Sequence, residues 1–168
     1  MTPAISRVDV VRSARQWIGT PYHHQASRLG AGTDCIGLVR GVWRDLYGVE
    51  PEALPGYSRD WAEATGRETL LEAARRHFVE IEPLGARPGD VLVFRFRPRV
   101  IAKHVGVLGS GYEAANRPGP VPAGAFGPAP PRLTLIHAVE GVPVSEVPLL
   151  GWWQRRIAAA FSFPGIID

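Results

Sequence analysis

Apolar residues recur at helical spacing in the first half of the chain. The first predicted helix begins near Ser6, whose hydroxyl is placed to cap it with Asp9 three residues on, and stops before Gly19 and Pro21. Its apolar face is formed by Val10, Val11, Ala14, Trp17 and Ile18. A second helix is predicted over 35–47, closed by Gly48, with Leu38, Val39, Val42, Trp43 and Leu46 on its buried side. Shorter helices are predicted around 58–64 and over 68–77.

From residue 78 onward the apolar period changes from about 3.6 residues to about 2. Strands are predicted over 79–82, 90–96, 104–108, 133–139, 142–147 and 155–163. Helices followed by strands with short connections predict an α+β domain, in which N-terminal helices pack on a mostly antiparallel sheet. Residues 109–132 are dense in Gly, Pro and Ala and predict an insertion loop. With no internal repeat and no visible boundary, we expect a single domain over 1–168.

The composition is that of a globular protein. A chain of 168 residues with 45% hydrophobic and 21% charged residues fits one domain and excludes a disordered segment of this length. The longest apolar runs, such as 91–94 and 157–161, are too short to cross a bilayer, so no membrane insertion is expected. The formal charge of +3 is carried by dispersed arginines, with Lys103 as the single lysine, and does not indicate nucleic-acid binding.

The N-terminal residues 1–9 show no basic stretch followed by an apolar core. We therefore expect a protein made in the cytoplasm without a secretory signal peptide. Cys35 is the single cysteine, which excludes an internal disulfide and a metal cage built from several cysteines.

Cys35 is the strongest candidate for a catalytic residue. It falls in the first turn of the second predicted helix, where Asp34 or Thr33 is the expected cap. Unpaired N–H groups and the positive end of the helix dipole favour a thiolate at such a position, so a lowered thiol pKa is expected. The alternative is a small buried cysteine packed on the sheet.

Two histidines in predicted strands are candidates to act with Cys35. His104 opens the strand 104–108, and His137 lies within the alternating strand 133–139. If these strands are antiparallel neighbours, the two imidazoles lie side by side on one face, where one serves as base for the thiol and the other orients it. The alternatives are a surface histidine at a strand end for His104 and a hydrogen-bonded core histidine for His137.

The remaining histidines and the paired tryptophans are given structural interpretations. His77 ends a predicted helix, where a cation is favourable. His23 and His24 lie in the loop before Cys35 and either line a cleft or sit on the surface. Trp152 and Trp153 are expected either to pack in the core or to form a surface ridge at which a partner docks.

Five motifs in order along the chain resemble the NlpC/p60 family of cysteine peptidases. They are Gly19-Thr20-Pro21-Tyr22, Asp34-Cys35-Ile36-Gly37-Leu38, Arg87-Pro88-Gly89-Asp90, His104-Val105-Gly106-Val107 and Ile136-His137-Ala138. The resemblance implies a papain-like α+β fold and hydrolysis of peptidoglycan stem peptides, typically between D-glutamate and diaminopimelate. No metal or other cofactor is implied.

The resemblance also implies a role for each matching residue. Cys35 is expected as the nucleophile, His104 as the base and His137 as the orienting third residue. Tyr22 and Asp34 are expected at the oxyanion and the substrate. Two features depart from the family pattern: Ile36 replaces the usual serine, and the stretch between His104 and His137 is longer than usual.

The C-terminal stretch Trp152-Trp153-Gln154-Arg155-Arg156-Ile157-Ala158-Ala159-Ala160-Phe161 resembles the ending of a subgroup from tailed phages and gene transfer agents. That resemblance implies tail or baseplate proteins as partners. It also implies a location in the tail of a particle, which carries the protein to the cell wall in the periplasm and makes a signal peptide unnecessary.

Three alternatives share the same residues. One is a structural tail protein that keeps the fold with little or no catalysis. Another is a zinc hydrolase with Cys35, His104 and His137 as ligands. The last is an acyltransferase or amidase, which differs from a peptidase only in its substrate.

Overall fold

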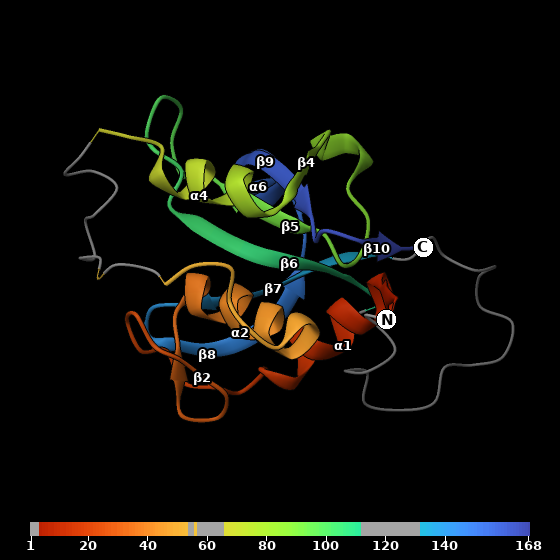
Figure 1. Ribbon diagram of the computed structural model, residues 1–168. Coiled ribbons are helices and arrows are strands. Elements are labelled where there is room, and N and C mark those ends of the chain that lie inside the picture. The colour runs from red at the N-terminus through yellow and green to blue at the C-terminus, as the bar shows by residue number, and fades with distance from the viewer. Residues whose placement is uncertain (1–3, 54–55, 57–65, 112–131) are drawn as a thin grey trace, which may run out of the picture.

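The computed structural model describes residues 4–53, 56, 66–111 and 132–168 (Figure 1). Its helices are α1 (Arg7–Gln16), α2 (Cys35–Tyr47), α4 (Thr69–His77), α6 (Gly151–Gln154) and the 3-10 turn η1 (Pro83–Gly85). Its strands are β1 (Ile5–Ser6), β2 (Ser27–Arg28), β3 (Gly32–Thr33), β4 (Val79–Ile81), β5 (Val91–Phe94), β6 (His104–Ser110), β7 (Leu133–Val139), β8 (Val142–Pro148), β9 (Ile157–Ser162) and β10 (Ile166–Ile167). The helix predicted around 58–64 and most of the predicted insertion loop lie outside the described residues.

The α+β fold with an antiparallel sheet is confirmed. Six strands form one sheet in the order β4-β9-β5-β6-β7-β8, and every pairing in it is antiparallel. β2 and β3 form a small hairpin before α2, and β1 pairs with β10 in parallel. The latter pairing brings the two ends of the chain together at one edge of the molecule (Figure 1).

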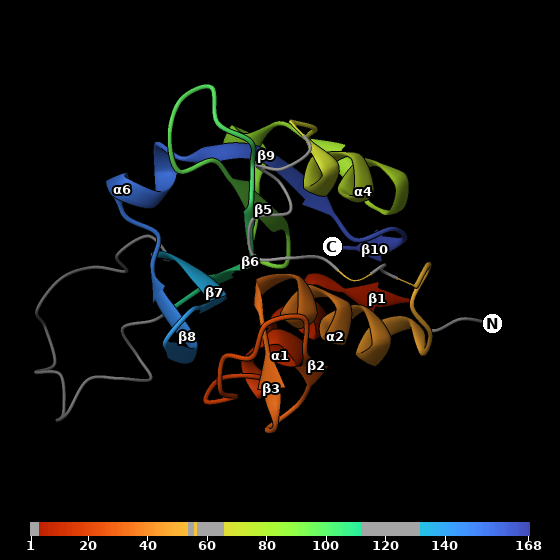
Figure 2. The same ribbon diagram turned by 90° about the vertical axis from the view of Figure 1, so that its left-hand side faces the viewer.

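The curved sheet separates two hydrophobic clusters. The larger one lies between α1, α2, α4 and one face of the sheet, and includes Trp17, Leu38, Val105, Val107 and Ile136. The smaller one lies on the opposite face, where Leu92, Phe94, Leu108 and Leu135 meet Trp153 of α6. Figure 2 shows α6 on the other side of the sheet from α2 and α4. Side chains of β6 and β7 alternate between the clusters, as the period of a strand requires.

The motif around Asp90 is structural. Its carboxylate is fully buried, accepts the backbone N–H of Arg87 at 2.7 Å and the guanidinium of Arg7 at 2.5 Å, and also binds the Ser162 hydroxyl. A buried carboxylate is tolerated only with such partners. These contacts fasten the first turn of α1 to the start of β5 and the end of β9.

The described structure corrects the predicted elements at three places. α1 ends at Gln16, so Ile18 is 45% exposed and does not belong to its apolar face. β6 continues through Ser110, which pairs with Leu133, so the predicted loop from 109 begins two residues too early. The short strands β1, β2, β3 and β10 were not predicted, because two residues are too few to show an alternating pattern.

Other predicted elements are confirmed. α2 and β7 have the bounds that the sequence predicts, and Ser6 and Asp9 form the expected reciprocal cap of α1. Within the described residues, no helix has the length and apolar character needed to cross a membrane.

Candidate active site

Cys35 is the first residue of α2, and Asp34 holds the chain at that point. Asp34 is the N-cap of α2: its carboxylate accepts the N–H of Gly37 at 2.8 Å and the N–H of Gln25 at 2.7 Å, and it is only 2% exposed. One carboxylate therefore satisfies the start of the helix and fixes the preceding loop. Asp34 fixes the start of α2 in this structure, and its expected contact with substrate stays a prediction.

The loop before Cys35 packs directly on α2 at Gly37. A Cβ atom at position 37 would lie 1.9 Å from the carbonyl oxygen of Ala26, so only glycine allows this approach. Tyr22 lies on the same loop, in a parallel bridge with Thr33, two residues before Cys35. The structure thus places Tyr22 close to Cys35 along neighbouring backbone, as the family pattern implies, while its role at the oxyanion stays a prediction.

His104 and His137 meet as predicted on neighbouring antiparallel strands. His104 Nε2 lies 3.0 Å from His137 Nδ1, and the side chains are 5% and 4% exposed. Gly106 lies between them, where a Cβ atom would be 3.1 Å from His137 Cβ and 2.7 Å from Leu135 Cδ1. The Gly in the motif therefore clears the space in which the imidazoles meet.

The thiol lies next to the start of β6. The backbone N–H groups of Val105, the residue after His104, and of Ile36 lie close enough to the sulfur of Cys35 to oppose a rise in its pKa. His104 Nε2 is engaged by His137, so Nδ1 is the nitrogen of that ring left for a further partner. Taken as a whole residue, Cys35 is partly buried.

The expected lowering of the thiol pKa is wrong for this structure. Burial, followed by the charge of Asp34, raises the pKa of Cys35 to about 12, and the nearby backbone N–H groups of Val105 and Ile36 oppose this effect without cancelling it. Burial also lowers the pKa values of His104 and His137, and the neighbouring ring of His137 lowers that of His104 further. These pKa shifts favour a protonated thiol at Cys35 and neutral rings at His104 and His137.

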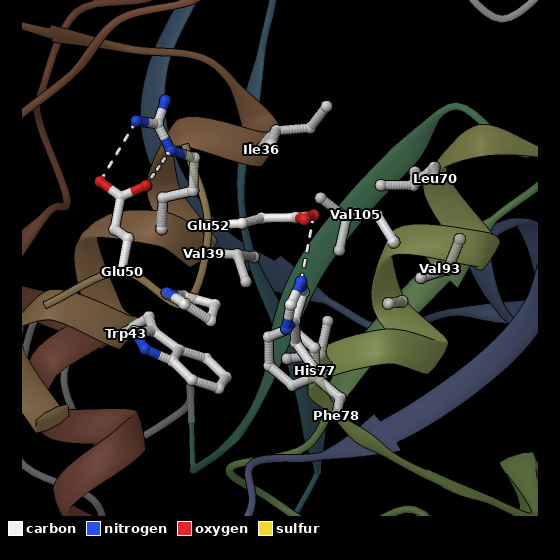
Figure 3. Close-up of a pocket in the computed structure, with 15 residues that line it drawn as sticks. Ile36, Val39, Trp43, Glu50, Glu52, Leu70, His77, Phe78, Val93 and Val105 are labelled. Carbon is white, nitrogen blue, oxygen red and sulfur yellow. Dashed lines mark hydrogen bonds and ion pairs between the residues drawn. The ribbon is translucent and has the colours of Figure 1, made fainter. Parts of the chain in front are cut away.

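An apolar pocket of about 90 Å³ adjoins the site (Figure 3). It is bounded on one side by Ile36, Val39, Arg40 and Trp43, which follow one stripe of α2, and on the other by α4 and the sheet. Ile36 and Val105, which line the pocket, follow Cys35 and His104 in the sequence, whereas Cys35 and His104 themselves are not among its lining residues. The isoleucine that departs from the family pattern is thus part of an apolar wall.

The other histidines take places away from the reacting groups. His77 ends α4, and its Nε2 lies 3.0 Å from Glu52 Oε1 (Figure 3), in line with the structural interpretation. His24 Nδ1 lies 3.7 Å from Asp34 Oδ2, so it belongs to the loop that Asp34 holds. His23 is exposed.

The sequence patterns missed the aromatic enclosure of the imidazoles. Trp153 lies with its ring centroid 5.5 Å from that of His104 and 4.9 Å from that of His137. Phe94 and Phe96 contact His104 from the sheet side, at 5.8 Å and 5.7 Å. The adjacent residues Trp152 and Trp153 were the signal in the sequence for an aromatic contact, but the histidines that Trp153 contacts are distant in the chain.

The zinc alternative would require three ligand side chains to converge on one point. Across residues 4–53, 66–111 and 132–168, no group of three or more His, Cys, Asp and Glu side chains is arranged to hold a metal ion. A thiol at the start of a helix and two linked imidazoles on the sheet are the groups that nucleophilic acyl transfer requires.

Comparison with known proteins agrees with this geometry. The model of the NlpC/P60 family matches residues 19–155. A gamma-DL-glutamyl hydrolase from Bacillus subtilis is 29% identical over 116 residues, which make up 68% of this chain and 23% of that protein. The chain thus corresponds to about a quarter of the length of this relative.

Two solved structures share the fold. The NlpC/p60 domain of the peptidoglycan hydrolase SagA is 21% identical with a TM-score of 0.54, covering 95% of this chain and 100% of that one. A lipoprotein-like NLP/P60-family protein from Staphylococcus aureus is 20% identical with a TM-score of 0.53, covering 96% of this chain and 42% of that one. The papain-like fold of this family is therefore confirmed.

Proposed function

The chain belongs to the NlpC/P60 family of cysteine peptidases and peptidoglycan hydrolases, and on that premise we propose that it cleaves peptidoglycan stem peptides with Cys35 as nucleophile and His104 as base. The observation that carries the proposal is the linked pair of buried imidazoles, together with a Cys35 thiol whose pKa is affected by the backbone N–H of Val105, the residue after His104. The expected bond joins D-glutamate to diaminopimelate. The name of the Bacillus subtilis relative, a gamma-DL-glutamyl hydrolase, supports an amide of this type.

The proposed reaction is acyl transfer in two steps. The Cys35 thiol gives its proton to His104 Nδ1 as the sulfur attacks the scissile carbonyl, and the oxyanion is held by the Cys35 N–H and by Tyr22. His104 then returns the proton to the leaving amine, so that the C–N bond breaks and a thioester remains. In the second step His104 takes a proton from water, which attacks the thioester and restores the thiol.

For Nδ1 of His104 to accept that proton, its Nε2 must carry hydrogen and donate to His137 Nδ1. His137 therefore selects the productive tautomer and fixes the plane of the ring. Asp34 contributes by holding Cys35 at the start of α2.

Digestion of purified peptidoglycan tests the proposal. We expect the wild type to release fragments with a new amino terminus on diaminopimelate, identified by mass spectrometry, and Cys35→Ala to release none. Cys35→Ser is the matched control, because it replaces the thiol by a hydroxyl group of similar shape that is a far weaker nucleophile. Equal products from wild type and Cys35→Ala would remove the peptidase assignment.

We further propose that the protein acts as part of a phage or gene-transfer-agent tail, made in the cytoplasm and carried to the wall by the particle. This is supported by the resemblance of residues 152–161 to the ending of that subgroup. We expect the protein in purified particles by immunodetection, bound to tail or baseplate components. If particles carrying Cys35→Ala assemble and penetrate the wall as the wild type does, the structural alternative gains support.

A further inference from the structure

The connection between β8 and β9 covers the imidazoles from the side opposite α2. β8 is an edge strand, whereas β9 lies between β4 and β5, so the chain between them has to pass β7, β6 and β5. α6 lies on this passage (Figure 2). Because His104 and His137 are on β6 and β7, the crossing segment brings α6 over the face on which they meet.

Trp153 of α6 contacts both rings. Its indole is tilted by 31° against His104, with centroids 5.5 Å apart, and stands at 89° to His137, with centroids 4.9 Å apart. Phe94 supports the indole from the sheet at 5.1 Å. Such aromatic contacts are favourable and directional, so they fix the rings as well as covering them.

From this geometry we propose that Trp153 is a positioning residue of the catalytic pair, which holds the rings of His104 and His137 at their mutual angle of 75° and keeps water from their outer side. The inference rests on the proposed function for its catalytic meaning. The structural part of the inference is that α6 covers one side of the two imidazoles, and this part does not depend on the substrate.

The surroundings of the pair contain few charges. Among the described residues, the titratable group that contacts each imidazole is the other imidazole, and the Cys35 thiol lies on the α2 side, near Val105. β5 and the residues after it contribute Phe94 and Phe96, which are uncharged. On the α6 side the charged residues are Arg155 and Arg156, and the guanidinium of Arg156 lies 3.9 Å from the centre of the Trp152 ring and binds the carbonyl oxygens of Trp152 and Phe96. Loss of the indole would therefore change the pKa values of the imidazoles mainly by exposing them to water.

Trp152 offers a matched control on the same helix. It is 47% exposed and contacts Trp153, Phe96 and Arg156. Among the ring contacts given for the described residues, none joins Trp152 to His104 or His137. Trp152→Ala thus removes an indole of equal size from α6 without opening the imidazole wall.

The test follows imidazole titration by nitrogen NMR in full-length protein carrying Cys35→Ala, which requires no turnover. We expect Trp153→Ala to raise the pKa of His104 or His137 by about one unit or more, Trp153→Phe to give a smaller rise, and Trp152→Ala to leave both values unchanged. Unchanged titration in Trp153→Ala and Trp153→Phe, or an equal shift in Trp152→Ala, would overturn the proposal. If Trp153→Ala fails to fold, Trp153→Phe decides the result alone.

A kinetic measurement on proteins with Cys35 intact separates positioning from substrate binding. We expect Trp153→Ala to lower kcat by about 10-fold or more, with KM within about twofold, and to move the acid limb of the pH profile upward. A rise in KM with unchanged kcat would instead assign Trp153 to substrate binding and overturn the positioning role. Should peptidoglycan not be cleaved by the wild type, the NMR result still decides whether Trp153 governs the imidazoles.

Discussion

His104 Nε2 and His137 Nδ1 lie 3.0 Å apart across two antiparallel strands, with both side chains buried. One nitrogen must donate and the other accept, so the two tautomers are coupled. The tautomer of His104 is thereby fixed by a residue 33 positions further along the chain. In the proposed reaction, this coupling keeps a neutral imidazole ready to act as the base.

His137→Ala is expected to lower kcat by about 10²-fold or more, because His104 loses the partner that fixes its tautomer and ring plane. His137→Asn keeps a polar group near Nε2 and should recover part of the loss. Steady-state kinetics on soluble stem peptides give kcat and KM separately. A kcat for His137→Ala within about twofold of wild type would show that the third residue is not needed.

Stability is expected to fall below about pH 6.5. Burial depresses the pKa values of His104 and His137 in the folded state, so the unfolded chain binds more protons once the pH falls below the ordinary value of about 6.5. The stabilisation by the neutral histidines is complete above that pH and is lost toward the depressed values. At pH 5 the loss should be about 1–2 kcal/mol per histidine.

Urea unfolding at pH 7.5 and pH 5 measures this change. His137→Gln should reduce the difference in free energy of unfolding between the two pH values. His23→Gln is the control, because His23 is exposed. An equal difference in wild type and His137→Gln would show that the imidazoles do not carry the pH dependence.

Asp34 variants should separate capping from charge. Asp34→Ala is expected to cost about 1–2 kcal/mol of stability, because the N–H groups of Gly37 and Gln25 lose their acceptor. Asp34→Asn keeps an acceptor but removes the negative charge that raises the pKa of Cys35. The thiol pKa should therefore fall in Asp34→Asn while staying above its ordinary value, since burial is the larger cause. The rate of alkylation against pH reports this change, and a raised pKa would contradict the assignment.

Gly106→Ala is expected to damage both stability and activity. The added methyl group would meet Leu135 Cδ1 at 2.7 Å and the carbonyl oxygen of Ile136 at 2.9 Å, which forces β6 and β7 apart near His137. The cost should be about 1–3 kcal/mol, measured by urea unfolding. Gly85→Ala is the matched control, because a Cβ atom there meets nothing within 4 Å. Wild-type stability and kcat in Gly106→Ala would refute the account of this glycine.

Elements that are determined by nearby residues could be predicted from the sequence. α2 has an apolar stripe, an acidic cap and a closing glycine, and its bounds were predicted correctly. The pairing of His104 with His137 could be anticipated, because each begins or lies within a clearly alternating strand. The bounds of α2 depend on neighbours within a few residues, whereas the pairing of the two histidines also depends on β6 and β7 being antiparallel neighbours.

Features that depend on distant contacts were not predicted. The thiol pKa was expected to fall because the helix terminus is visible in the sequence, whereas burial by the sheet and loop is not. The same holds for Trp153, whose ring partners come from β5, β6 and β7. The pair Trp152-Trp153 shows in the sequence that large aromatic side chains are present. Which residues they cover is decided by the path of the segment between β8 and β9, which carries α6 across the sheet.

Cys35 and His104, the proposed nucleophile and base, are supported by different hydrophobic clusters. Cys35 packs with α1, α2 and the helix side of the sheet, whereas His104 is enclosed by Phe94 and Trp153 on the other side. The alignment of Cys35 with His104 therefore depends on how the two hydrophobic clusters are positioned relative to each other across β6. A slight slip between the clusters would disconnect proton transfer while secondary structure survived, so catalytic competence should be lost on heating before the cooperative melt begins.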